Sequence, residues 1–154
     1  MTSTEDSSVL NRCGSVASEW TRRLWAGIAP SLAAVEQRLR AELTSRCPEV
    51  DELVRYSGQL GGKRLRPALV LLAADSVGNV GPDHVVLGTV VEMIHTATLI
   101  HDDVIDEADT RRHLATARAR WDNQASVLLG DFLFSHAFYL ASTLGSTVAC
   151  RWIG

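Results

Sequence analysis

The sequence predicts an all-α protein, and three observations lead to that fold class. Apolar residues recur every three or four positions along most of the chain, which is the period of an amphipathic helix. The chain shows no strand–turn–strand signal, and strands do not alternate with helices as they do in α/β folds. Its 154 residues, 46% of them hydrophobic and 21% charged, supply enough apolar side chains for about one domain.

The N-terminal third is expected to form a tail followed by two helices. Residues 1–16 are polar and rich in Ser and Thr, so we expect a flexible tail there and place the helical domain at residues 17–154. Pro30 is expected to break or kink the helical run between Ser18 and Ser45, because proline has no backbone N–H to donate. The apolar positions of that run are Trp20, Leu24, Ile28, Leu32, Val35, Leu39 and Leu43.

A short helix, a loop and an apolar helix are expected next. Pro48 ends the preceding helix, and a short helix is expected at about residues 50–56. Residues 57–67 (SGQLGGKRLRP) have the glycines of a loop, and Pro67 suits the first turn of a helix. That helix is expected to end at Gly78, since glycine is the usual residue past a helix C-terminus.

The remaining chain is expected to be helical as well. The segment from Gly81 to Asp106 contains a β-branched stretch, VVLGTVVEMI, that would suit a strand, but its length without a turn signal favours a helix. A further helix is expected over about residues 125–144, with Leu128, Leu129, Phe132, Leu133, Ala137 and Leu140 in the core. The last residues, STVACRWIG, begin another helix that stops midway, so we expect the chain to be one part of a larger fold.

Composition excludes several functional classes. The net charge of −3 argues against a general nucleic-acid surface, so any anion site must be local. The three cysteines, Cys13, Cys47 and Cys150, match no zinc spacing and are expected to be reduced thiols. The N-terminus lacks the pattern of a signal peptide, and no uninterrupted apolar run reaches membrane-spanning length. We therefore expect a cytoplasmic protein without a transmembrane segment.

The most informative stretch is LIHDDVIDEADTRR, residues 99–112. On a helix, Asp102 and Asp106 lie one turn apart on the same face, which also carries Thr98 and His95. Paired carboxylates repel each other, and their position at a helix C-terminus is unfavourable to the helix dipole. A solvated acidic helix end is the simpler alternative. Mg²⁺ held by both carboxylates and by a phosphorylated ligand would offset the cost.

Two basic segments could complete an anion site. Arg111 and Arg112 follow the acidic cluster, and the planar fork of arginine suits phosphate oxygens. GGKRLRP adds three cations, Lys63, Arg64 and Arg66, next to glycines that allow a ligand to approach the backbone. The order of its residues is not that of a Walker A loop. Either segment alone would also suit a solvated surface, and His95 alone would suit helix packing.

Together, GGKRLRP and HDDVIDEADTRR resemble the trans-type polyprenyl diphosphate synthases, and the resemblance covers roughly residues 20–154. It implies an all-α, isoprenoid-synthase-type helical bundle, here truncated after roughly half of the family's helices. It also implies an enzyme that condenses isopentenyl diphosphate with an allylic diphosphate. In that reaction Mg²⁺ assists departure of the allylic diphosphate, and the double bond of isopentenyl diphosphate attacks the resulting carbocation.

The resemblance also implies roles for individual residues. Asp102 and Asp106 match the Mg²⁺ ligands of the first aspartate-rich motif, with Asp103 as a further catalytic residue in support. Arg111 matches the arginine of the allylic diphosphate site. The residues matching the isopentenyl diphosphate site are Lys63, Arg66, His95 and Arg112. Ala97 and Thr98 stand where bulky residues stop chain growth, so their small size implies a medium or long all-trans product.

The sequence departs from the family in two ways. No second aspartate-rich motif follows Asp109, so we expect the chain alone to be inactive. His113 and Ala115 replace the usual glycine and proline, which is expected to loosen the turn that places Arg111 and Arg112. The chain could be a fragment or a truncated or frameshifted synthase, or a natural half-length subunit completed by another chain. A homodimer is also possible by analogy, and the alternative function is that of a non-catalytic helical partner or regulatory subunit of a full-length synthase.

Overall fold

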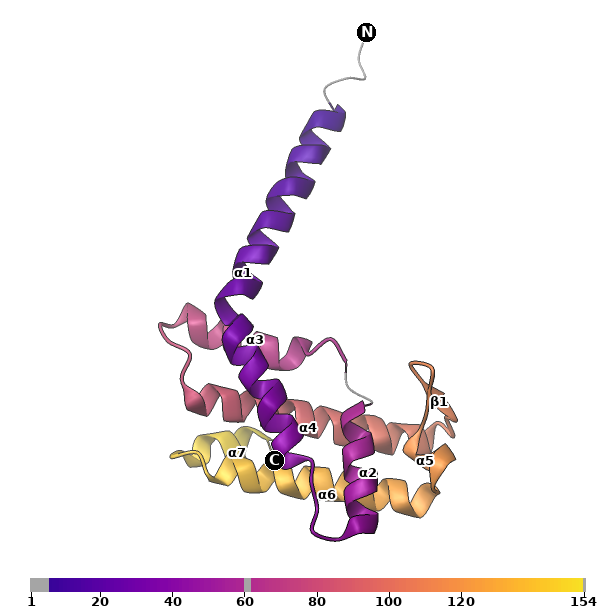
Figure 1. Cartoon of the computed structure of the whole chain (residues 1–154). Helices are drawn as coiled ribbons and strands as arrows, with labels where there is room; N and C mark the ends of the chain where they lie inside the picture. Colours follow the sequence, from indigo (N-terminus) through magenta and orange to yellow (C-terminus); the bar gives the residue numbers. More distant parts are fainter. Residues whose placement is uncertain (1–5, 60–61, 154) are drawn as a thin grey trace.

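The computed structural model describes residues 6–59 and 62–153, and for residues 6–18, 20–22 and 24 it describes the backbone alone. The described part is largely helical, which confirms the all-α fold class (Figure 1). A two-stranded hairpin is the exception within it. The elements are α1 (Asp6–Glu42), α2 (Pro48–Gln59), α3 (Leu65–Ser76), α4 (Pro82–Ile105), β1 (Thr110–Arg111), β2 (Leu114–Ala115), α5 (Ala117–Arg120), α6 (Asn123–Ser142) and α7 (Thr147–Ile153).

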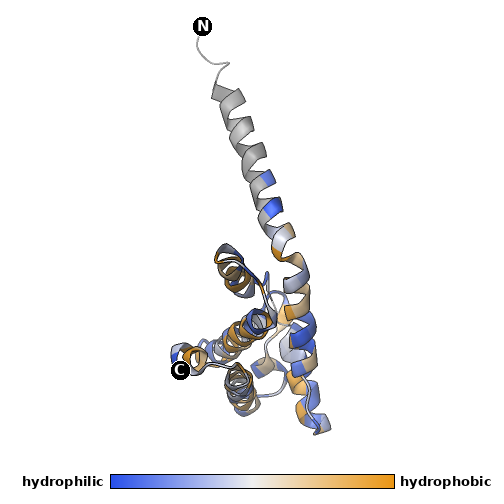
Figure 2. Ribbon diagram, turned by 90° about the vertical axis from the view of Figure 1, so that its left-hand side faces the viewer, coloured by the Kyte–Doolittle hydropathy of each residue, from blue (hydrophilic) through white to orange (hydrophobic). Residues whose placement is uncertain are grey.

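Helix α4 is the centre of the fold. It packs against α1, α3 and α6, and its contact with α6 is the most extensive between any two elements described. Figure 2 shows α1 crossing one side of α3, α4 and α6, which are seen nearly end-on. The core between α4 and α6 follows helical spacing on both sides, with Val90, Met93, Ala97 and Ile100 facing Leu129, Leu133, Ala137 and Leu140.

Helix α1 differs from the expectation in two places. It continues through Pro30 without a break, so the expected division into two helices is wrong. An interior proline costs a helix on the order of 3 kcal/mol, but Ile28 and Val35 on either side are both buried in the core, and α1 changes direction partway along its length (Figure 1). The helix also begins at Asp6, inside the expected tail, while residues 1–5 and the side chains of Trp20 and Leu24 lie outside the described residues.

Most other expected elements are confirmed. Helix α4 spans the segment whose β-branched stretch would also suit a strand, and Gly81 is its N-cap. Gly78 follows α3 with a φ of 134°, a backbone angle that favours glycine. The short hairpin between α4 and α5 is an element that the sequence pattern did not predict. Leu128, expected in the core, is 59% exposed, because it lies on the side of α6 away from α4.

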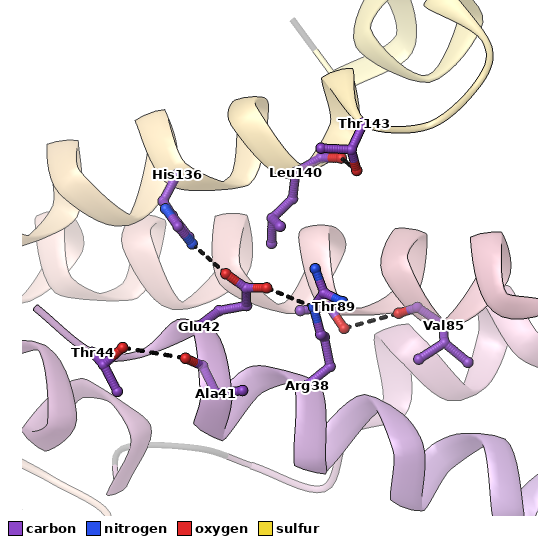
Figure 3. Close-up of polar contacts among 9 residues, drawn as sticks. All are labelled: Arg38, Ala41, Glu42, Thr44, Val85, Thr89, His136, Leu140 and Thr143. Carbon is purple, nitrogen blue, oxygen red and sulfur yellow. Dashed lines mark hydrogen bonds and ion pairs between the residues drawn. The ribbon is translucent and has the colours of Figure 1, made fainter.

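An ion-pair network fastens α1 to α6 (Figure 3). Glu42, near the end of α1, accepts from Arg38 one turn earlier at 2.6 Å and contacts Nε2 of His136 on α6 at 2.7 Å. The His136 ring also stacks on Phe132. These contacts fix the end of α1 beside α6.

Among the described residues, α6 is the one helix long and apolar enough to cross a membrane. Four of its apolar residues are buried in the core: Leu129, Leu133, Ala137 and Leu140. Packing against α4 accounts for that apolar face without a membrane. Length and composition alone do not separate such a core helix from a membrane span.

Candidate functional site

The four residues expected to hold a diphosphate line one open cleft of about 570 Å³: Lys63, Arg66, His95 and Arg112. They come from three separate parts of the chain, which are the loop before α3 with the first turn of α3, the middle of α4 and the hairpin turn. The cleft is also lined by Gly62, Arg64, Leu65 and Glu92. The fold therefore brings together residues that are up to fifty positions apart in the sequence.

Gly62 is the point where the basic loop meets the hairpin. A Cβ added at this position would lie 2.6 Å from Nη1 and 2.8 Å from Nη2 of Arg112. Carbon and nitrogen atoms do not approach so closely without a bond, so any side chain at position 62 would displace the guanidinium. Glycine at this position lets Arg112 lie directly over the loop.

The beginning of α3 adds to the positive potential of the cleft. Its N-cap residue, Arg64, makes no side-chain hydrogen bond to the first turn of the helix. Arg66 lies in that first turn, and Pro67 has no N–H to satisfy. The N-terminal end of a helix carries partial positive charge and favours an anion, so the helix and the Arg66 guanidinium act in the same direction.

Arg64 has a different role from the one its sequence position indicates. On sequence alone it groups with Lys63 and Arg66 as a cation of the anion site. In the structure its side chain instead turns inward and is 16% exposed. It donates to Glu36 of α1 and, at 2.8 Å, to Glu92 of α4. Burial favours loss of its charge, but these two carboxylates outweigh burial and raise the pKa of Arg64.

The sequence contains a signal for this ion pair. Glu92 interrupts the apolar stretch VVEMI, and its side chain is only 5% exposed. A carboxylate on the buried face of an apolar helix requires a cationic partner, because an isolated buried charge is very costly. The periodicity of α4 thus indicates that a nearby basic residue serves Glu92 rather than a ligand.

His95 occupies the wall of the cleft among these charges. Its burial lowers the pKa of the imidazole below 6.5, and Arg66 lowers it further. Glu92 opposes this shift, while Arg112 and Arg111 add to it. These contacts thus favour the neutral imidazole, and an anion bound in the cleft would favour the protonated form.

At the end of α4, the middle aspartate of the acidic motif is buried. Asp103 is 2% exposed, and its Oδ1 accepts from both Nε and Nη2 of Arg111 at 2.8 Å. Its Oδ2 makes no hydrogen bond to any part of the chain that the structure describes. Asp103 therefore supports Arg111 directly and lies apart from Asp102 and Asp106, which are exposed.

The hairpin that carries the arginines is well formed despite its unusual sequence. Arg111 pairs with Leu114, and the two turn residues, Arg112 and His113, have φ angles of 52° and 69°. Two consecutive residues of positive φ are typical of a tight two-residue turn. The hydroxyl of Tyr56 donates to the carbonyl of Ala115 at 2.6 Å and so fastens the hairpin to α2. The expected loosening at His113 and Ala115 is wrong: the turn persists, with His113 in a conformation that favours glycine.

Residues 47–153, well over half of the chain, match the polyprenyl synthetase family. The chain belongs to this family. It is 48% identical over 117 residues to the octaprenyl diphosphate synthase of Haemophilus influenzae, an alignment that covers 76% of this chain and 36% of that protein. It is 39% identical over 137 residues to an all-trans-nonaprenyl-diphosphate synthase (geranyl-diphosphate specific) of Rhodobacter capsulatus, over 88% of this chain and 42% of that protein.

Solved structures of polyprenyl synthetases show the same fold. A decaprenyl diphosphate synthase from Rhodobacter capsulatus matches with a TM-score of 0.79 and 44% identity, over 86% of this chain and 41% of that one. A polyprenyl synthase from Caulobacter crescentus CB15, complexed with calcium and isoprenyl diphosphate, also has a TM-score of 0.79, with 36% identity over 84% and 40% of the two chains. This chain thus spans well under half the length of the relatives it matches.

The acidic end of the chain fits a metal that is shared with a ligand. Among residues 6–59 and 62–153 there is no group of three or more His, Cys, Asp or Glu side chains that could hold a metal ion. Asp102 and Asp106 remain as an exposed pair one helical turn apart. Mg²⁺ usually takes one or two carboxylates and completes its octahedron with water and phosphate oxygens. The two aspartates fit Mg²⁺ bound together with a diphosphate.

The two residues expected to affect product length lie on different sides of α4. Ala97 is fully buried in the core that α4 shares with α6. Thr98 is exposed, one turn before Asp102, and its Oγ1 donates to the carbonyl of His95 at 2.8 Å. Of these two residues, Thr98 is therefore the one on the exposed surface of α4, close to the acidic end.

Proposed function

We propose that this chain provides the isopentenyl diphosphate site and one side of the allylic diphosphate site of a polyprenyl diphosphate synthase. The observation that carries the proposal is the single cleft lined by Lys63, Arg66, His95 and Arg112. Three permanent cations, a helix N-terminus and an imidazole surround a space open to solvent, which suits a diphosphate. The family of the chain limits the diphosphates to those of isoprenoid synthesis.

Within this proposal the acidic end binds the second substrate. Arg111, held by Asp103, would bind the allylic diphosphate, and Asp102 and Asp106 would hold Mg²⁺. When bound, Mg²⁺ supplies positive charge that stabilises the departing diphosphate. Arg111 adds a fixed guanidinium there, and Arg112 and Lys63 hold the isopentenyl diphosphate so that its double bond lies close to the reacting carbon.

Product length is a further part of the proposal. Thr98 is small and exposed, so it leaves room for a growing chain along α4, in line with the octaprenyl, nonaprenyl and decaprenyl synthases that this chain resembles. We propose a product longer than farnesyl diphosphate. Coexpression of this chain with a segment that restores condensation, followed by measurement of the product length, would test this proposal. A product of only fifteen carbons would contradict an open path beside Thr98.

We propose that these 154 residues bind substrate but condense it poorly by themselves, because the sequence contains one aspartate-rich motif. Incubation of the pure chain with Mg²⁺, farnesyl diphosphate and labelled isopentenyl diphosphate tests this point. Efficient formation of labelled polyprenyl diphosphate would contradict it. The cytoplasmic location expected from the sequence remains part of the proposal, as does completion by another chain or by a second copy.

Binding distinguishes this proposal from the alternative of a non-catalytic helical partner. Isothermal titration with isopentenyl diphosphate should show binding to the chain, and Arg66→Gln should weaken it by about tenfold, the loss of one charge-assisted hydrogen bond. Arg151→Gln, an exposed arginine on α7, is the matched control and should bind as the unchanged chain does. A folded chain that binds no isopentenyl diphosphate would favour the alternative.

A further inference from the structure

Arg64 stands out as a charged residue of the cleft that the proposed function does not use. Its neighbours Lys63 and Arg66 are exposed, whereas its own side chain is 16% exposed and directed between α1 and α4. Its backbone has a φ of 53° and a ψ of 35°, the left-handed region that L residues seldom adopt. A residue keeps such a conformation only where its surroundings hold it there.

The surroundings that hold Arg64 are two carboxylates on two different helices. Nε and Nη2 donate to Glu36 of α1, and Nη1 donates to Glu92 of α4 at 2.8 Å. The planar guanidinium thus bridges the two helices in a fixed orientation, which a lysine ammonium does not reproduce. Glu92 lies less than one turn before His95 on α4, so the bridge ends beside the cleft wall.

We propose that Arg64 is a positioning residue: its bridge between Glu36 and Glu92 fixes residues 62–66 so that Lys63 and Arg66 face the cleft opposite His95. The inference rests on the proposed function, because it concerns the same diphosphate site. The bridge also pairs the carboxylate of Glu92 inside a cleft that binds an anion. Without Arg64, that carboxylate would repel the ligand and the left-handed turn would lose its anchor.

The test separates position from charge. Arg64→Gln removes the bridge and one positive charge, whereas the double variant Arg64→Met with Glu92→Met removes the bridge and leaves the net charge unchanged. Replacement of a buried ion pair by apolar residues of similar size commonly preserves folding. The probe is inorganic diphosphate, titrated calorimetrically into the full chain, with circular dichroism and thermal unfolding to establish that each variant is folded.

We expect the double variant to bind inorganic diphosphate about tenfold more weakly than the unchanged chain, and Arg64→Gln at least as weakly. Arg64→Lys keeps the charge and one ion pair, so it should recover part of the affinity. Arg55→Gln, at an exposed ion pair on α2, is the matched control and should bind normally. A role in folding alone would change the melting temperature and leave the affinity of the folded protein unaltered.

The outcomes of this inference and of the proposed function differ. If the unchanged chain binds diphosphate, Arg66→Gln weakens binding and the folded double variant binds like the unchanged chain, the inference about Arg64 is wrong and the proposed function stands. If the unchanged chain and Arg66→Gln bind diphosphate equally, or neither binds it, the proposed function fails and the inference fails with it.

Discussion

The basic and acidic ends of this site differ in how far the chain itself completes them. At the basic end, Gly62 receives the guanidinium of Arg112, and Arg64 ties the loop to Glu36 and Glu92. At the acidic end, Asp102 and Asp106 are exposed at the end of a helix whose dipole disfavours them. The cations are thus held by contacts within the chain, whereas the proposed function assigns the stabilisation of the two carboxylates to Mg²⁺.

The Asp103–Arg111 pair lies between the two ends and is the contact whose loss we expect to cost most. Arg111→Gln would leave Asp103 buried without a cation, and breaking a buried pair in this way costs about 3–5 kcal/mol in the free energy of unfolding. Urea unfolding measures the change. Arg55→Gln removes an exposed pair instead and should cost no more than about 1 kcal/mol. Equal losses in the two variants would show that Asp103 does not depend on Arg111.

The close approach at Gly62 provides the next test, because it concerns the basic end alone. In Gly62→Ala the new Cβ displaces the Arg112 guanidinium, so we expect about a tenfold weaker affinity for inorganic diphosphate and an almost unchanged melting temperature. Gly145→Ala is the control, since no described atom lies within 4 Å of its Cβ position. An unchanged diphosphate affinity in the alanine variant would show that Arg112 binds without the support of the loop.

Several helices and the basic end of the site could be predicted from the sequence. The helical period predicted α3, α4 and α6, because these helices bury one face and expose the other. The family resemblance of the two motifs implied the group of Lys63, Arg66, His95 and Arg112, which the structure brings into one cleft. In both cases a local pattern carries the information.

Features that depend on contacts between distant segments were not predicted. On sequence alone, Arg64 groups with Arg66. The buried position of Glu92 indicates a basic partner, but the packing of α1 beside α4 determines that Arg64 is the residue that meets Glu36 and Glu92. Pro30 is tolerated because residues on both sides of it are buried in the core, and the local sequence does not reveal this packing. The hairpin turn forms at His113 although the local sequence disfavours it, since Tyr56 of α2 fastens the strand that follows.

Removal of the backbone strain in that turn is expected to increase the stability of the chain. His113 has a φ of 69°, and relief of this left-handed conformation in His113→Gly should raise the free energy of unfolding by about 1 kcal/mol. Ala115→Gly, at an extended position two residues later, should instead lower it. Chemical denaturation of both variants compares them. A loss of stability in both would mean that the His113 side chain has contacts worth more than its backbone strain.

Removal of a negative charge at the acidic end should increase the stability of the chain when no metal is bound. Without metal, Asp102→Asn should raise the free energy of unfolding by about 0.3–1 kcal/mol, because it removes a negative charge from the C-terminal end of α4. Asp83→Asn, in the first turn of the same helix, should lower it by a similar amount. With Mg²⁺ and inorganic diphosphate together, the unchanged chain should gain stability that Asp102→Asn does not. An equal gain in both would place the metal elsewhere.

The smallest expected effect is the contribution of His95 to the pH dependence of stability. Burial and Arg66 hold the pKa of folded His95 below 6.5, so below that pH the unfolded chain binds more protons at this residue than the folded chain. The free energy of unfolding should therefore decrease as the pH falls below 6.5, and His95→Gln should remove that part of the decrease. Saturating inorganic diphosphate should also reduce it, because an anion in the cleft favours the protonated imidazole. Parallel pH profiles of the two proteins, with and without diphosphate, would show that His95 does not face the anion at the basic end.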